Sequence, residues 1–465
     1  MQIQDVVHTD LKIDFLKTEQ QQSWCFYGDN DSGIDSFLQL LDGRLTDFTA
    51  TTIDLSPGAG VLSFYGQQQI FEEELRNDDS DFMDSTDPGT TVEEFLGAPE
   101  KAIPLLKTFN LESCLHTGFR QLSSGQCRKL IILREVIRGS QTIILQNPYD
   151  GLDVLSCTEL NHALEQIAQT TVEIIILINS INDIPRWCSH IGIFHNNRLT
   201  HAGPRDKTLP HLITTSEPTA PIETPFTNNN ASKESQPANP KKELIRLKNG
   251  FAGYGGTTLF AGLNLDIFSG DHTLICGPNG CGKSTLLDII TGDNPKCYAN
   301  DLSLFGNKRG TGESIWQLKQ QMGIISSSLH RNHRIPSTAL HVVLSGLFDT
   351  IGLYDKVSTI QIKEARRWLA WLELSPLADK PFRRLEFAEQ RLILIGRALI
   401  KKPQLLIFDE ATQGLDDKNR HKLLDLLDLI AADKLATILF VSHRTDEYRP
   451  FFSQKVQLDS YSVCC

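Results

Sequence analysis

The fold is decided by residues 277–285, which read GPNGCGKST. The apolar run His272–Cys276 precedes this stretch and predicts a short strand, and LLDII at 286–290 follows it and predicts a helix. The pattern G-x-x-x-x-G-K-[ST] between a strand and a helix indicates a loop that binds phosphates.

Each residue type in this loop has a chemical reason. Glycines allow the backbone to wrap phosphates with its N–H groups pointing inward, and the N-terminus of the helix adds positive potential. Lys283 is expected to face the β- and γ-phosphates, and the Ser284 hydroxyl is expected to bind Mg²⁺. The predicted ATP-binding residues of the loop are Gly277, Pro278, Asn279, Gly280, Cys281, Gly282, Lys283, Ser284 and Thr285.

An acidic pair supplies the second part of a reaction centre. The run Leu405–Asp409, LLIFD, predicts a buried strand that ends in an acid, and Glu410 follows it. By themselves these two acids would fit an ordinary loop. Beside a complete phosphate loop, they indicate that Asp409 helps to hold Mg²⁺ and that Glu410 orients or deprotonates the attacking water. The sequence therefore predicts Mg²⁺-dependent hydrolysis of ATP.

The chain of 465 residues divides at a stretch rich in Thr, Pro, Asn and Ser that lacks hydrophobic periodicity. We expect one domain at residues 1–212, a flexible linker at 213–242 and a second domain at 243–465. The two halves show a weak internal repeat, in which apolar strands alternate with helical stretches. This pattern predicts an α/β fold with a mostly parallel sheet covered by helices in each half.

The order of the phosphate loop, a signature segment, LLIFDEATQGLD at 405–416 and FVSH at 440–443 resembles the ATP-binding-cassette family. Each half of the chain resembles one cassette, so the resemblance covers nearly the whole chain. It implies two tandem P-loop nucleotide-binding domains, each with a helical subdomain. It implies that His443 is the switch histidine that contacts the γ-phosphate, that Gly414–Asp416 is the D-loop, and that Tyr254 stacks on adenine.

The sequence departs from the family at the Q-loop, which usually links the nucleotide state to a transport subunit. Ser327 holds the place of the Q-loop glutamine in the second half. In the first half Gln67, or alternatively Gln68, holds it. The missing glutamine beside the complete phosphate loop argues against ordinary coupling to a membrane partner.

The first half carries a degenerate phosphate loop, GDNDSGID at 28–35. Ile34 stands where the family has lysine, and Asp35 stands where it has serine or threonine. An aliphatic residue in place of a cation, with an added acid, opposes a polyphosphate. The two acids and the switch histidine are also replaced, by Gln146, Asn147 and Ser180. We therefore expect no hydrolysis at this loop.

The signature segments show the opposite distribution. The first half has LSSGQ at 122–126, whereas the second half has LEFAEQ at 385–390, in which Glu389 would oppose the γ-phosphate. Cassettes of this family pair head to tail, with each ATP between one phosphate loop and the other cassette's signature. The resemblance thus implies a single composite site within the chain, completed by the signature residues Ser123, Ser124, Gly125 and Gln126.

Composition limits the partners. A net charge of −12 argues against a general polyanion binder. The stretch 1–12 shows no secretory signal, and apolar runs such as Ile174–Ile178 are too short to cross a bilayer. The ten cysteines include no Cys-x-x-Cys pair, so zinc-site spacing is absent. We expect a cytoplasmic protein that reaches the inner membrane only by docking on another subunit.

A narrower resemblance rests on the second-half segments 291–330 and 342–355. They are similar to tandem cassettes encoded beside bacterial molybdate-uptake genes, which implies an association with molybdate transport. Two alternatives stay open. One is an ATPase that acts on ribosomes or nucleic acid, which the short uncharged linker disfavours, and the other is a slow nucleotide-sensing regulator.

Overall fold

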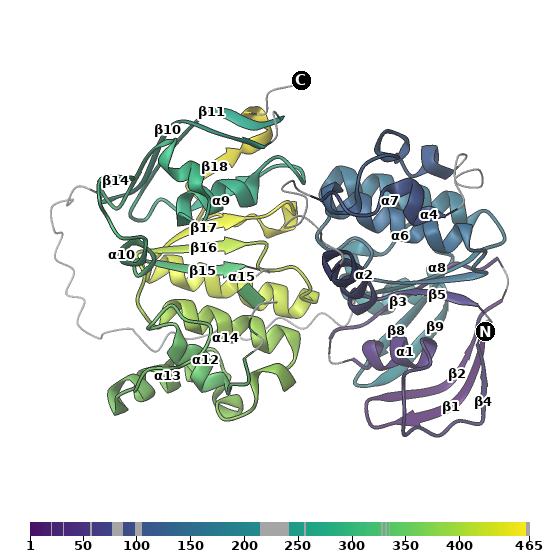
Figure 1. Cartoon of the computed structure of the whole chain (residues 1–465). Coiled ribbons are helices and arrows are strands. Elements are labelled where there is room, and N and C mark those ends of the chain that lie inside the picture. Colours follow the sequence, from purple (N-terminus) through teal and green to yellow (C-terminus); the bar gives the residue numbers. More distant parts are fainter. Residues whose placement is uncertain are drawn as a thin grey trace. The chain divides into compact units, whose positions relative to one another are not determined.

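The computed structural model describes residues 1–19, 21–30, 32–55, 58–76, 87–97, 105–213, 241–254, 257–326, 329–330, 333 and 335–461. The chain divides into two compact units, one of Met1–Pro218 with Asp416–Lys418 and the other of Thr219–Leu415 with Asn419–Cys465. Figure 1 labels their helices and strands. Most of the stretch expected to be a linker, residues 214–240, lies outside the described residues.

The second unit is built around a five-stranded parallel sheet in the order β15-β16-β17-β12-β18 (Figure 1). Its strands are β15 (Met322–Ser326), β16 (Leu405–Asp409), β17 (Thr437–Val441), β12 (Thr273–Cys276) and β18 (Gln454–Gln457). The central strands are apolar and buried, as expected of parallel strands covered on both faces. Because the strands are parallel, their carboxyl ends all lie at one edge of the sheet.

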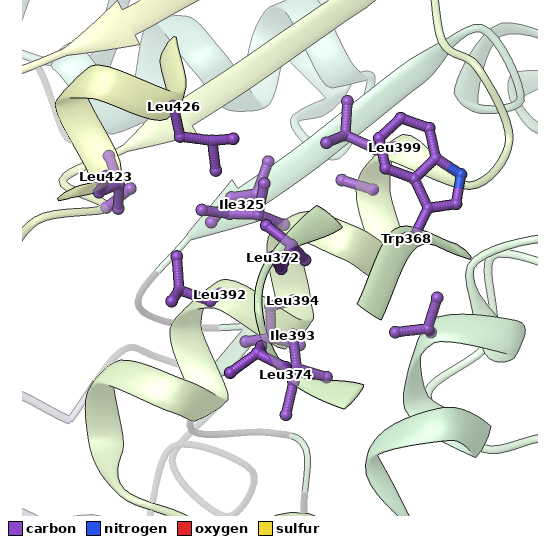
Figure 2. Close-up of a cluster of buried hydrophobic side chains, with 14 of the residues drawn as sticks. Ile325, Trp368, Leu372, Leu374, Leu392, Ile393, Leu394, Leu399, Leu423 and Leu426 are labelled. Atoms are coloured by element: carbon purple, nitrogen blue, oxygen red, sulfur yellow. The ribbon is translucent and has the colours of Figure 1, made fainter. Parts of the chain in front are cut away.

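Helices and this sheet share one hydrophobic core. The helices are α12 (Ala339–Ser345), α13 (Thr359–Trp371), α14 (Phe387–Leu399) and α15 (Asp417–Ala432). Figure 2 shows Ile325 of β15 among Leu392 of α14, Leu372 at the end of α13 and Leu426 of α15. This packing fixes the start of α14, which is formed by the second signature segment.

A second core lies between the parallel sheet and a four-stranded antiparallel sheet in the order β11-β10-β13-β14. Its elements are β10 (Glu243–Tyr254), β11 (Thr257–Phe268), β13 (Asp301–Leu304) and β14 (Asn307–Lys308), with α9 (Lys283–Thr291), and the short helix α10 (Ile315–Lys319) contributes Leu318. Leu286 and Ile289 of α9 are fully buried in this core, so the helix behind the phosphate loop is held from its far side.

The first unit has a nine-stranded sheet in the order β4-β1-β2-β9-β8-β3-β7-β6-β5. The strands are β1 (Gln2–His8), β2 (Leu11–Lys17), β3 (Trp24–Tyr27), β4 (Thr52–Asp54), β5 (Ala59–Leu62), β6 (Thr142–Gln146), β7 (Glu173–Ile178), β8 (His190–His195) and β9 (Arg198–Pro204). The helices are α1 (Ile34–Leu41), α2 (Phe64–Arg76), α4 (Val92–Leu96), α6 (Ser124–Ile137), α7 (Val154–Ala168) and α8 (Arg205–Ile213).

The stretch β8-β3-β7-β6-β5 repeats the strand order of the second unit, with β3 in the place of β12. The predicted α/β class, with a mostly parallel sheet and helices, is therefore confirmed. Among the described residues, no helix is both long enough and apolar enough to span a membrane.

Candidate nucleotide-binding site

The carboxyl edge of the second unit's sheet gathers the predicted functional residues. The phosphate loop follows β12, His443 follows β17, and Asp409 ends β16 with Glu410 after it. Since β17 pairs with both β12 and β16, these three strand ends are neighbours at one edge. Ligands of open parallel sheets bind at this edge, because loops and helix N-termini converge there.

The phosphate loop ends where α9 begins. Gly282 is the N-cap of α9 with φ 97°, and a side chain there would be strained as well as crowded against Phe260 at 3.1 Å. A glycine at this position lets the loop turn sharply into the helix, so that the first N–H groups of α9 face the loop. These groups form an anion-binding position of the type found at helix N-termini.

Lys283 is held by the loop itself. Its side chain is 5% exposed, and its Nζ donates hydrogen bonds to the carbonyl oxygens of Gly277 and Pro278, both at 2.9 Å. A buried ammonium needs such partners, and these carbonyls keep it at the mouth of the loop. The cation is therefore positioned to exchange its carbonyl partners for phosphate oxygens.

Asp409 and Ser284 form the candidate metal position. Burial and the neighbouring Glu410 raise the pKa of Asp409 to about 6, although a hydrogen bond from the Ser284 hydroxyl counteracts the rise. A buried carboxylate with a raised pKa is stabilised by a nearby cation, and its hard oxygens with a hydroxyl suit Mg²⁺. The donor set therefore fits the metal that the sequence predicts.

We expect Asp409→Asn to stabilise the protein when nucleotide and Mg²⁺ are absent. The folded pKa of about 6 lies above the ordinary aspartate value of 3.8, so the native state loses stability as pH rises from about 4 to about 6. Asparagine removes this penalty, which amounts to at most about 3 kcal/mol above pH 6. Thermal melts of both proteins at pH 4.5 and pH 7.5 check this: the gain must be larger at pH 7.5. An equal gain in melting temperature at both pH values would contradict the raised pKa of Asp409.

Glu410 and His443 face each other across this edge. His443 Nδ1 lies 3.6 Å from Glu410 Oε1, and it has no hydrogen-bond partner among the described residues. Burial alone would raise the pKa of Glu410, but His443 and Lys283 more than offset this, so its pKa is lowered. Glu410 is therefore a charged carboxylate at neutral pH, and its backbone is left-handed, with φ 49°.

The first signature segment forms the N-terminus of α6. The Ser123 hydroxyl accepts from the N–H of Gln126 at 3.2 Å, and the Gln126 side chain accepts from the N–H of Ser123 at 2.9 Å. This capping box holds the segment rigid without any charge. Gly125 is buried, and the side chain of Ser124 lies outside the described residues.

The second signature segment has the same cap made of acids. Glu386 is the N-cap of α14, and Glu389 accepts from its N–H at 3.0 Å. Glu386 thus takes the position of Ser123 and Glu389 that of Gln126. Ala388 therefore takes the position of Gly125. Two carboxylates still surround this helix N-terminus, which disfavours an anion there.

The degenerate loop of the first unit has a backbone similar to that of the second-unit phosphate loop but lacks its lysine and serine side chains. Gly33 caps α1 with φ 91°, close to the value at Gly282, and Ile34 is buried with 6% exposure. The Gln146 amide donates to Asp35 Oδ1 at 2.9 Å. Where the second unit pairs Ser284 with Asp409, the first unit pairs an acid with an amide.

The strand register corrects one position. In the second unit Asp409 pairs with Val441, so the switch histidine is two residues beyond the pairing. In the first unit Gln146 pairs with Leu177, which puts Asn179 in the histidine's place. The expectation that Ser180 holds this place is therefore wrong. Neither residue is titratable, so the inference that the first unit lacks the switch is unaffected.

Two predicted positions cannot be placed. The side chain of Tyr254, predicted to stack on adenine, and Ser327, predicted to replace the Q-loop glutamine, lie outside the described residues. In the first unit Gln67 accepts a hydrogen bond from Arg128 at 3.2 Å, and the Gln68 side chain is likewise outside.

Comparisons with known proteins match either part of the second unit or nearly the whole chain. The family model described as ABC transporter matches residues 260–413. The chain is 34% identical over 448 residues to the ABC transporter ATP-binding protein ModF of Escherichia coli, covering 94% of this chain and 91% of that protein. It is 26% identical to an uncharacterized ABC transporter ATP-binding protein of Schizosaccharomyces pombe, covering 95% of this chain and 93% of that one.

A solved structure with a similar fold is that of an archaeal ribosome recycling factor in complex with the archaeal ribosomal stalk protein. Its TM-score is 0.57 at 15% identity, and the match covers 95% of this chain and 84% of that one. At this identity the likeness concerns the fold alone.

Proposed function

Because the chain belongs to the ATP-binding-cassette family, whose characteristic activity is ATP hydrolysis, we propose that ATP is hydrolysed at the carboxyl edge of β12, β16 and β17 in the second unit. The observation that carries this proposal is the convergence of Lys283, the acidic pair Asp409–Glu410 and His443 at that edge. Lys283 and the N-terminus of α9 bind the triphosphate.

Glu410 is the proposed water-orienting group. Its carboxylate is kept charged by His443 and Lys283, so it can accept a proton from water or hold water in line with the γ-phosphate. His443 contacts the γ-phosphate in this proposal, and its Nδ1 lies 3.6 Å from Glu410 Oε1. Asp409 and Ser284 would hold Mg²⁺, which neutralises charge on the β- and γ-phosphates when bound.

We propose that the signature segment completing this site is that of the first unit, Ser123–Gln126. A signature segment presents a helix N-terminus to the γ-phosphate, so it must carry no negative charge. The cap of α6 is neutral, whereas that of α14 consists of Glu386 and Glu389. The working phosphate loop and the working signature thus belong to different units, which supports one composite site per chain.

Glu410→Gln should bind ATP and lower its turnover by about 10²-fold, because glutamine keeps the size of the side chain but cannot accept a proton from water. Steady-state phosphate release and equilibrium binding of a fluorescent ATP analogue measure the two properties. Glu389→Gln changes a half-buried acid of the α14 cap in the same way, so it is the matched control and should leave turnover unchanged. Wild-type turnover in Glu410→Gln would place the base elsewhere.

The proposed biological setting is molybdate uptake, which rests on the narrower resemblance and on 34% identity to a transporter ATP-binding protein. Glu410→Gln is suited to test this setting, because a variant that hydrolyses ATP slowly stays in its ATP-bound state. Partners that bind this state therefore remain attached during purification. Purification of tagged Glu410→Gln from cells should recover a molybdate-transport membrane subunit. Recovery of ribosomes or nucleic acid, with no such subunit, would overturn the proposed setting while leaving the ATPase assignment intact.

A further inference from the structure

A buried acid lies directly behind the switch histidine. Glu447 belongs to a short 3-10 turn, Thr445–Glu447, four residues beyond His443, and only 1% of it is exposed. Carboxylates are rarely buried to this extent unless they hold something in place. No motif of the chain had pointed to this residue.

Glu447 is tied to the residue before the switch histidine. The Ser442 hydroxyl, itself buried, donates to Glu447 Oε2 at 2.5 Å, a length typical of a strong bond to a carboxylate. The same hydroxyl accepts from the N–H of Arg444 at 3.0 Å, and the N–H of Ser442 donates to the carbonyl of Ile275 in β12 at 3.2 Å. Ser442 and Arg444, on either side of His443, are therefore both fixed.

The hydrogen bond of the Glu447 carboxylate is the one from Ser442, because its other oxygen, Oε1, has no hydrogen-bond partner among the described residues. Burial raises the pKa of Glu447, and Ser442, Thr412, Arg444 and Arg420 only partly offset the rise. Glu447 therefore fixes the turn that bears His443 through Ser442.

We propose that Glu447 is a positioning residue for ATP hydrolysis: by accepting the hydrogen bond from Ser442 it fixes the turn that carries His443 and so holds His443 beside Glu410. His443 Nδ1 lies 3.6 Å from Glu410 Oε1. If the turn were not fixed, the His443 side chain would shift, and a displacement of about 1 Å can cost about 10²-fold in rate. The proposal rests on the assignment of Glu410 and His443 to the reaction.

The test compares kcat and KM for ATP in Glu447→Ala, Glu447→Gln and Ser442→Ala. Glu447→Ala should lower kcat by about 10- to 100-fold, with KM within about 3-fold, because the phosphate loop is untouched. Glu447→Gln keeps an oxygen for Ser442 and should restore kcat to within about 3-fold of wild type. Ser442→Ala should lower kcat, and the double variant with Glu447→Ala should be no slower than Glu447→Ala alone.

A matched control separates positioning from simple loss of stability. Glu313 is a partly buried acid that accepts from Arg309 and from the N–H groups of Gly310 and Thr311, far along the chain from the reacting residues. Glu313→Ala should lower the melting temperature and leave kcat unchanged. Equal kcat losses in Glu447→Ala and Glu313→Ala, or a wild-type kcat in Glu447→Ala, would overturn the proposal.

Two further outcomes are decisive. If Glu447→Ala does not fold, Ser442→Ala decides: a wild-type kcat there overturns the link, and a lower kcat with unchanged KM supports it. If wild type and Lys283→Ala hydrolyse ATP equally, the ATP site itself is wrong, and the positioning role of Glu447 is wrong with it. Failure of the ATP-site proposal can be told apart from failure of the Glu447 proposal alone, because the Lys283→Ala comparison involves no change at Glu447.

Discussion

Lys283→Ala should reduce ATP hydrolysis by at least about 10³-fold and weaken ATP binding. The ammonium group is the one side-chain cation that the phosphate loop brings to the mouth of this site, and it is buried with 5% exposure. Loss of one preorganised charge that faces the transferred phosphate costs about 10²- to 10³-fold, and loss of ground-state binding adds to this. Phosphate release by the purified variant at saturating ATP measures the effect.

The matched control for Lys283→Ala is Ile34→Ala, the same position in the degenerate loop. Both residues follow the glycine that caps a helix, Gly282 for α9 and Gly33 for α1, with similar backbone angles. Because Ile34 contributes only to the core, its replacement should lower stability and leave turnover nearly unchanged. Normal turnover in a folded Lys283→Ala variant would refute the whole assignment of the site.

Sequence reasoning predicted the α/β class and the residues that meet at one edge of the second unit's sheet. It could do so because a phosphate loop carries its chemistry in nine consecutive residues, and because an apolar strand before Asp409 fixes where that acid emerges. Local patterns of this kind depend only on neighbours in the chain.

The errors have a different physical origin. Comparison of the two halves residue by residue placed Ser180 at the position of His443. The register between β6 and β7 determines the equivalent residue instead, and it cannot be predicted locally because paired strands are distant in the chain. Glu447 was missed because nothing in the residues around it shows that it is buried beside Ser442.

The first unit shows how a site loses its chemistry without losing its fold. Asn147 keeps the left-handed backbone of Glu410, with φ 43° against 49°, and its N–H donates to Leu177 as that of Glu410 donates to Val441. Asparagine adopts this conformation more readily than glutamate does, so the strain disappears together with the acid. The replacement of the acid thus leaves the backbone of this strand end unchanged.

A substitution in the first signature segment should also have a large effect. We expect Gly125→Asp to reduce ATP hydrolysis by about 10³-fold, although Gly125 and Lys283 belong to different units. In the composite-site proposal the N-terminus of α6 faces the γ-phosphate, and a carboxylate there would repel it instead of stabilising its charge. The two hydrogen bonds of the neutral cap join Ser123 and Gln126 and do not involve Gly125, so the cap can persist in the variant.

Steric effects at Gly125 need their own control. A Cβ at this position would meet Ser156 Oγ at 3.0 Å, which requires a small shift of that side chain. Gly125→Ala introduces this contact without charge, and alanine already stands at the equivalent position, Ala388, in the second unit. Gly125→Ala should therefore keep most of its turnover, whereas Gly125→Asp should lose it.

The measurement is steady-state ATPase activity for Gly125→Asp, Gly125→Ala and Glu389→Gln, with folding checked by thermal melts. The composite site requires that only Gly125→Asp loses turnover, because the acidic cap of α14 faces no working phosphate loop. If Gly125→Asp folds and hydrolyses ATP normally while Glu389→Gln changes the rate, the signature of the second unit serves its own phosphate loop. Two chains would then have to pair through their second units, and turnover would rise with protein concentration.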